Sequence, residues 1–376
     1  MNLIITLIVV LLISHCFVFL VEKLKLAKVI GLLLAGLLLG YPPVRAAIIE
    51  PQSEIIFDLG NIALLALMFV AGLESSWREI CKEEKETLII AIFAMIIPFL
   101  CGFAVLQMLG FSLVASLMGG VCMSITAEAT KVEVLLEFKK LKTKVGATMM
   151  TAGIIDDLLG LAFFVVITYF LGGARFIENF LVIAAVAAFF AGIILQKVIG
   201  RKHPWLKSFE RALNYFLIPF FFVAIGLHFD FGAILLNPFI LTAVIATALI
   251  GKFVGIFLTK PFLSFSWKQL YLIGWAMNSR GAIEMAFALI ALNTKLVSTE
   301  LYSALIVMAL FTTLLFPVMF VRILKKNPKI MNGWVVKKSA FSQFTAMSRN
   351  TRRFCESGKL SRLKFARRKI LKKSRD

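Results

Sequence analysis

Apolar runs of about 20 residues recur along this chain, and they restrict its possible folds more than any other feature. Each run can cross about 30 Å of hydrocarbon as a helix, whereas a transmembrane barrel strand would alternate in polarity over about ten residues. Hydrophobic residues make up 60% of the 376 residues and charged residues only 16%, against about 25% charged residues in soluble domains. We therefore expect an all-α integral membrane protein.

The apolar runs predict about eleven transmembrane helices. The second run is short, and polar residues interrupt the fifth and the tenth. The first run lacks a basic start and a clear small-residue cleavage site, so we interpret it as a helix and not as a signal peptide. The expected spans lie near residues 2–22, 28–40, 55–74, 87–109, 112–137, 145–171, 177–198, 208–228, 237–259, 268–293 and 299–323.

The basic residues predict the orientation in the cell membrane. With the N-terminus outside, the inner loops hold seventeen Lys and Arg residues, and the outer loops hold only Arg45, Arg175 and Lys295. This distribution follows the positive-inside rule. Eighteen more basic residues from Arg322 onward also lie inside, and they predict a basic cytoplasmic tail over 324–376. We expect this tail to bind anionic lipid and not nucleic acid, because it is tethered beneath a membrane.

The membrane region contains an internal repeat. The residues around Gly36 resemble those around Gly192, and the residues around Gly72 resemble those around Gly226, at similar spacings. Because the matched helices run in opposite directions, the repeat is inverted, which is typical of transporters. The expected transmembrane domain covers residues 1–323, with one repeat at about 1–171 and the other at about 177–323.

The two interrupted runs occupy matching places in the repeats. Thr126 and Arg280 each lie 54 residues after the second matched glycine of their half, within breaks at 124–128 and 278–281. Paired interruptions are the best sequence pointer to the binding site of a transporter. Unwound backbone exposes carbonyl oxygens that suit hard cations, and half-helix dipoles place partial charges at each break.

Buried charges mark the expected site, because a charged residue deep in a membrane costs about 2.5–3.5 kcal/mol on insertion scales and is usually functional. Asp156 and Asp157 lie midway along an apolar run, and their side chains point about 100° apart on a helix. Lys252, too deep to reach the surface easily, is the expected partner of Asp156. That pair could simply hold helices together, but Asp157 would remain a second buried carboxylate that takes up a proton or a cation.

The interruptions supply further candidates. Arg280 and Glu284 are four residues apart and are expected to pair, offsetting the helix dipoles, with direct contact to an ion as the alternative. The hydroxyls of Ser124 and Thr126 either contact the ion or bond back to their own helix. The residues expected to support the crossing are Asn278, Arg280, Glu284 and Glu128.

These motifs resemble those of the monovalent cation:proton antiporter superfamily. The resemblance rests on S-x-T-A at 124–127, on the paired Asp156 and Asp157, and on FVAGLE at 69–74. In addition, the sequence RGAI that begins at Arg280 resembles the second crossing helix of sodium/proton exchangers. The resemblance covers residues 1 to about 323. It implies two crossing discontinuous helices and a core plus a scaffold domain. It also implies that Asp157 binds the ion and the proton, and that Asp156 pairs with the lysine of electrogenic members, here Lys252.

The chain departs from this family pattern in two places. Only about 33 residues separate Asp157 from Ala191, where relatives usually carry two more helices, including helices used for dimerisation. Whether a homodimer forms is therefore left open. Glu128 and Lys131 replace small or apolar residues. They either form an i,i+3 pair, or Glu128 adds a negative charge to the site and changes the choice of ion.

These observations together predict a secondary transporter that exchanges Na⁺ for protons by alternating access at Asp157. Li⁺ would be a surrogate, and K⁺ and the stoichiometry stay open. We expect no enzyme, because adjacent aspartates on one helix do not suit an aspartyl protease dyad. Five scattered cysteines predict no structural metal, and nothing predicts a cofactor. The main alternative is a sodium-coupled solute symporter on a similar fold, followed by a cation channel or a sensor.

Overall fold

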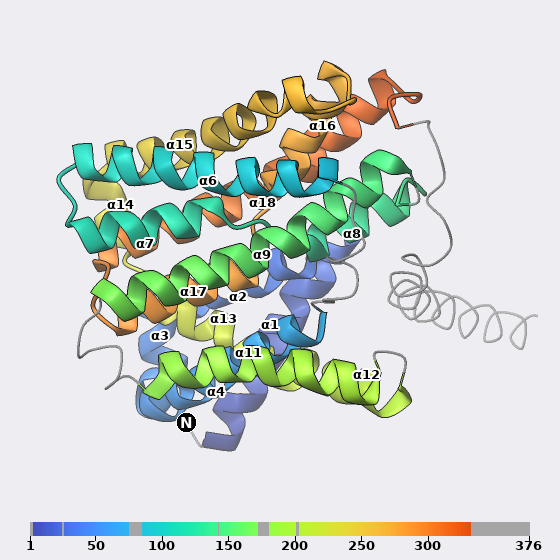
Figure 1. Ribbon diagram of the computed structural model, residues 1–376. Helices are drawn as coiled ribbons and strands as arrows, with labels where there is room; N and C mark the ends of the chain where they lie inside the picture. Colours follow the sequence, from blue (N-terminus) through green and yellow to red (C-terminus); the bar gives the residue numbers. More distant parts are fainter. Residues whose placement is uncertain are drawn as a thin grey trace, which may run out of the picture. The chain divides into compact units, whose positions relative to one another are not determined.

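The regular secondary structure is helical, as the uniform apolarity of the runs predicts. The computed structural model describes residues 3–24, 26–74, 85–141, 143–171, 180–200 and 203–331, and it contains no strand within these ranges. The helices are α1 (Leu3–Lys23), α2 (Lys28–Gly40), α3 (Pro42–Ile48), α4 (Ser53–Glu74), α6 (Lys85–Met108), α7 (Leu113–Ser124), α8 (Glu128–Glu137), α9 (Lys144–Leu171), α11 (Phe180–Ile199), α12 (Pro204–Ala212), α13 (Ile218–Leu227), α14 (Phe231–Leu236), α15 (Pro238–Leu258), α16 (Trp267–Met277), α17 (Ala282–Asn293) and α18 (Thr299–Lys326) (Figure 1). The expected all-α membrane fold is thereby confirmed, whereas residues 332–376 of the basic tail lie outside the described residues.

Each of the eleven expected segments contains helix. Eight helical stretches of the described chain are long and apolar enough to cross a membrane. A ninth arises if α2 and α3 form one span across their 82° bend, which was not expected from the sequence. Short helices make up the two interrupted segments, α7 with α8 and α16 with α17. The count of about eleven crossings therefore stays a prediction.

Serine caps fix where the two broken helices begin. Ser112 Oγ accepts a hydrogen bond from the backbone nitrogen of Ala115 at the start of α7. Ser266 and Gln269 form a capping box at the start of α16. Such caps satisfy backbone donors that lack a partner in the first helical turn. Ser112 and Ser266 are separated by as many residues as Thr126 and Arg280, so the caps follow the register of the repeat.

Glycines allow close helix crossings in the group formed by α2, α4, α11 and α13. Helix α2 packs on α13 and α4 packs on α11, which is visible in the lower part of Figure 1. A methyl group at Gly36 would overlap the backbone of Phe222, and a methyl group at Gly192 would lie 2.8 Å from the backbone nitrogen of Leu73. Small residues permit such approaches between membrane helices. The sequence repeat relates α2 to α11 and α4 to α13, so the crossing of α2 with α13 corresponds to the crossing of α11 with α4.

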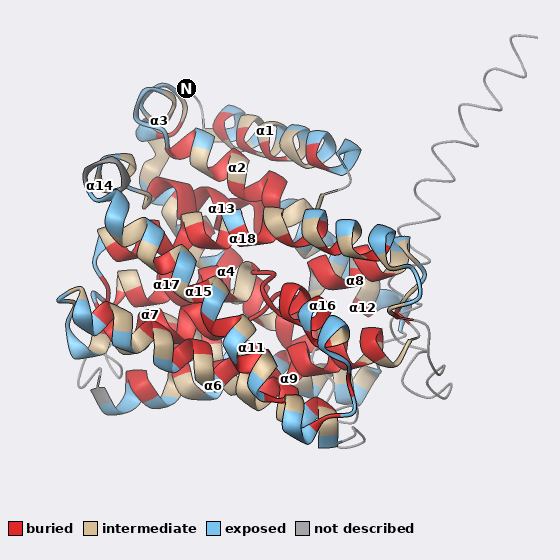
Figure 2. Cartoon of the chain, turned by 90° about the horizontal axis from the view of Figure 1, so that it is seen from above, coloured by how far each residue is buried: buried red, intermediate tan, exposed pale blue. Residues whose placement is uncertain are grey.

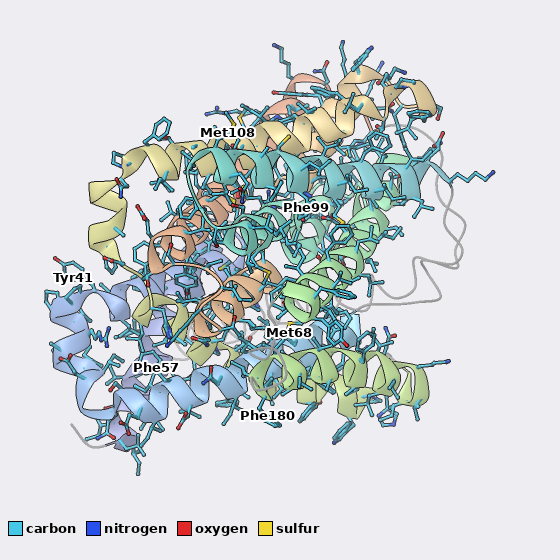
Figure 3. All side chains as sticks on the ribbon, turned by 60° about the vertical axis from the view of Figure 1, so that its left-hand side comes forward. Tyr41, Phe57, Met68, Phe99, Met108 and Phe180 are labelled. Atoms are coloured by element: carbon cyan, nitrogen blue, oxygen red, sulfur yellow. The ribbon has the colours of Figure 1, made fainter. Side chains whose placement is uncertain are left out.

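A second group of helices surrounds the two breaks. In this group α6 packs on α7, α9 and α15, and α15 packs on α16 and α18. Figure 3 shows Phe99 and Met108 of α6 toward the top, and Phe57 and Met68 of α4 toward the bottom. Buried residues, red in Figure 2, concentrate where the two groups meet, for example along α13, α17 and α18. The polar breaks of the second group therefore lie in a part of the chain that is closed off from its surface.

Candidate functional site

The two interrupted helices are joined to each other at their breaks. Helix α7 ends at Ser124 and α8 begins at Glu128, while α16 ends at Met277 and α17 begins at Ala282. The backbone nitrogen of Ala127 donates to the carbonyl of Ser279 at 2.8 Å, and the Ser279 hydroxyl donates to the Ala127 carbonyl at 3.0 Å. The breaks predicted from the sequence thus meet and satisfy part of each other's backbone, which an apolar environment requires.

Arg280 stabilises the end of α7. Its side chain is fully buried, and its guanidinium donates to the carbonyl of Cys122 at 3.3 Å and to the carbonyls of Met123 and Ile125. These carbonyls belong to the last turn and the end of α7, where the helix dipole is negative. The Nε atom also lies 3.8 Å from Glu284 Oε2. The expected pairing of Arg280 with Glu284 is present, but it is the longer of these contacts.

Asp156 is held by two side chains, one from the break after α7 and one from α15. Its Oδ2 accepts a hydrogen bond from the Thr126 hydroxyl and lies 3.2 Å from Lys252 Nζ. The same ammonium donates to Thr126 Oγ1 at 2.8 Å and to the carbonyl of Ser124. Asp156 and Lys252 are both fully buried. The ion pair expected from the sequence is therefore present, and it is tied to the break between α7 and α8.

Asp157 is next to Asp156 in the chain but takes no part in its ion pair with Lys252. Its side chain is 7% exposed, and Oδ1 has no hydrogen-bond partner among the described residues. It interacts electrostatically with Glu128, Asp156, Lys131 and Lys252. A buried carboxylate in this position favours a bound proton or a bound cation, because an isolated negative charge is costly in a medium of low dielectric constant. Unlike Asp156, Asp157 has no ion pair with a described residue to offset its charge.

The other candidates differ in how they face the site. The Ser124 hydroxyl donates to the Val121 carbonyl at 2.7 Å, so it bonds back to its own helix and offers only its carbonyl to Lys252. Asn278 lies buried in the second break, where its Nδ2 donates to the Gly274 carbonyl at 2.9 Å. Contact between an ion and the Ser124 hydroxyl stays a prediction.

The sequence left open whether Lys131 pairs with Glu128. The structure buries it completely, with Nζ donating to the Met149 carbonyl at 3.2 Å and contacting Met277 Sδ at 3.9 Å. Glu128 is half-buried one turn earlier on α8. Both side chains lie against Gly153 of α9, where a methyl group would overlap Lys131 Nζ and lie 3.2 Å from Glu128 Oε1. The available sequence signal was this glycine, one helical turn before Asp157.

Comparison with known families gives one match that spans most of the chain. The model of the family described as "Sodium/hydrogen exchanger, transmembrane" matches residues 6–185 and 171–326. The two matched segments overlap at residues 171–185, in the part of the chain where the sequence predicts two helices fewer than in relatives.

Individual relatives and one solved structure agree with this match. The Na(+)/H(+)-K(+) antiporter GerN of Bacillus cereus is 24% identical over 346 residues, covering 78% of this chain and 88% of the relative. The Na(+)/H(+) antiporter of Enterococcus hirae is 25% identical over 363 residues, covering 81% and 94%. The sodium proton antiporter MjNhaP1 from Methanocaldococcus jannaschii, solved at pH 8, shares the fold with a TM-score of 0.62 at 17% identity. That comparison covers 86% of this chain and 100% of the other.

Proposed function

The chain belongs to the sodium/hydrogen exchanger family, and on this basis we propose that it is a secondary transporter that exchanges Na⁺ for protons across the cell membrane. The names of the Bacillus cereus and Enterococcus hirae relatives support this reaction. Li⁺ and K⁺ are the other cations to test, and the relative from Bacillus cereus is named for K⁺ as well as Na⁺. The positive-inside distribution supports an N-terminus outside the cell and a cytoplasmic C-terminus.

Asp157 is the shared site for the cation and the proton. The observation that carries this assignment is a nearly fully buried carboxylate whose Oδ1 has no hydrogen-bond partner in the described chain and which, unlike Asp156 with Lys252, forms no ion pair there. A proton or a monovalent cation can each neutralise Asp157, and the two compete because one carboxylate cannot be neutralised twice. This competition couples the movement of one species to the movement of the other.

Asp156 and Lys252 respond to the occupancy of Asp157. Their ion pair is tied through Thr126 to the break between α7 and α8, so a change in charge at Asp157 reaches the backbone that lines the site. In alternating access, the joined breaks would face the two sides of the membrane in turn. Loading Asp157 with a cation or a proton lowers the cost of that movement, because a neutral site crosses an apolar region more easily than a charged one.

The test is exchange in liposomes that contain the purified protein and an internal pH dye. A pH gradient is imposed, and Na⁺, Li⁺ or K⁺ is added in turn to wild-type protein and to Asp157→Asn. We expect Na⁺ to dissipate the gradient with wild-type protein and not with Asp157→Asn, although the variant folds. Normal exchange by the variant would remove Asp157 as the shared site. Failure of folded wild-type protein to respond to any of the three cations would refute cation/proton exchange.

A further inference from the structure

The region around Asp157 contains a group of five charges, and two of them, Glu128 and Lys131, were expected from the sequence to depart from the family pattern. Asp157 interacts electrostatically with Glu128, Asp156, Lys131 and Lys252, and Lys131 interacts with all three acids. We call these five residues the charge cluster. With every group ionised, three acids and two bases leave one excess negative charge. One monovalent cation, or one proton, therefore neutralises the cluster.

Lys131 is placed where it can act directly on Asp157. Its Nζ lies against Gly153 and is hydrogen-bonded to the Met149 carbonyl, both on α9. Gly153 is one turn before Asp157 on the same helix, and helical side chains lean toward the preceding turn. The Asp157 side chain thus leans toward the turn on which the ammonium of Lys131 is seated. The missing side chain of Gly153 provides the space for that ammonium.

We infer that Lys131 is a tethered cation of the ion site, which competes with the transported cation for Asp157 and sets its affinity together with Glu128. The inference rests on the proposed exchange function and adds to it the residues that determine affinity. Glu128 compensates the charge of Lys131, so the pair leaves the net charge of the cluster unchanged. A buried structural pair would also be neutral, but its two members would not have opposite effects on cation binding.

The opposite effects follow from the charge of the cluster. Lys131→Met leaves two excess negative charges, and we expect the apparent KM for Na⁺ to fall by about tenfold, as loss of one like charge in a poorly screened site allows. Glu128→Gln leaves no excess charge, and we expect the KM to rise by about tenfold. The double variant restores one excess charge and should move the KM back toward the wild-type value. Glu137→Gln, at the exposed end of α8, is the matched control and should leave the KM unchanged.

The experiment measures the Na⁺ dependence of exchange in liposomes and, independently, the increase in Tm that added NaCl produces in detergent. Opposite shifts in the two single variants, in both measurements, support the inference. If Lys131→Met does not fold, a raised KM in Glu128→Gln that the double variant reverses supports it equally. If wild-type protein exchanges normally but the two single variants shift the KM in the same direction, or do not shift it, the inference is overturned and the proposed function is not. Wild-type protein that exchanges no cation overturns the proposed function, and this inference with it.

Discussion

Removing one member of the buried pair Asp156–Lys252 is expected to destabilise the protein more than removing both. Nζ and Oδ2 are 3.2 Å apart, and neither side chain is exposed. Loss of one partner leaves an uncompensated buried charge, which typically costs about 3–5 kcal/mol, whereas replacing both by neutral groups of similar size is often close to neutral. For Asp156→Asn and Lys252→Met we therefore expect a coupling free energy of about 3 kcal/mol or more.

The remaining contacts predict which single substitution costs more. In Asp156→Asn, the ammonium of Lys252 keeps two acceptors, the Thr126 hydroxyl at 2.8 Å and the Ser124 carbonyl. In Lys252→Met, Oδ2 of Asp156 keeps only the Thr126 hydroxyl, and Oδ1 has no partner among the described residues. We therefore place Asp156→Asn near the lower end of the range and Lys252→Met near the upper end.

Thermal unfolding of the purified variants in detergent measures the coupling. At about 2 °C per kcal/mol for a chain of this size, each single substitution should lower the Tm by about 6–10 °C, and the double variant should recover most of that loss. The matched control is the pair Glu86–Lys144, which is 2.5 Å apart but partly exposed. Its coupling should stay below about 1 kcal/mol. A coupling at Asp156–Lys252 no larger than at this control would refute the reasoning.

Two further substitutions test the crossing and the helix packing. Arg280→Lys keeps the charge, but one ammonium cannot replace a guanidinium that reaches the carbonyls of three residues. We therefore expect the exchange rate measured in liposomes to fall by about tenfold. An unchanged rate would show that the α7 carbonyls do not need the guanidinium. Gly192→Ala places a methyl group against the Phe69 carbonyl, and overpacking of about 2 kcal/mol should lower the Tm by about 4 °C. Gly232→Ala, at an exposed glycine of α14, is its control, and equal Tm values for the two variants would contradict the close crossing.

Much of the fold could be predicted because its signals are local. Apolar runs define membrane helices wherever water is absent, and each expected segment contains helix. The polar residues in the apolar runs predicted the breaks to within a residue or two of the observed helix ends at Ser124 and Met277. The repeat was also readable, because close crossings need glycine and the same spacing recurs in both halves. The 82° bend after α2 was not predicted, because Gly40, Pro42 and Pro43 signal the end of a helix but not the direction of the helix that follows.

The site was less predictable, because its contacts join distant parts of the sequence. Lys252 could be proposed as the partner of Asp156, since it is the one lysine within its apolar run. The main partners of Arg280 are backbone carbonyls more than 150 residues earlier in the chain, and a carbonyl carries no signal in the sequence. Local spacing therefore pointed to Glu284 alone. The contact of Lys131 with α9 was not predicted for the same reason, because its acceptor there is the Met149 carbonyl.

The joined breaks have a consequence for how the chain is assembled in the membrane. Ala127 belongs to the first repeat, but its backbone nitrogen and carbonyl find their partners at Ser279, in the second. Until translation reaches that point, the extended backbone after α7 has no acceptor or donor from its counterpart, and lipid supplies neither. The first repeat must therefore wait near the insertion machinery, or in contact with water, until the second repeat arrives. The contact between the two breaks therefore cannot form before the second repeat has been inserted, and neither half of the chain can form it alone.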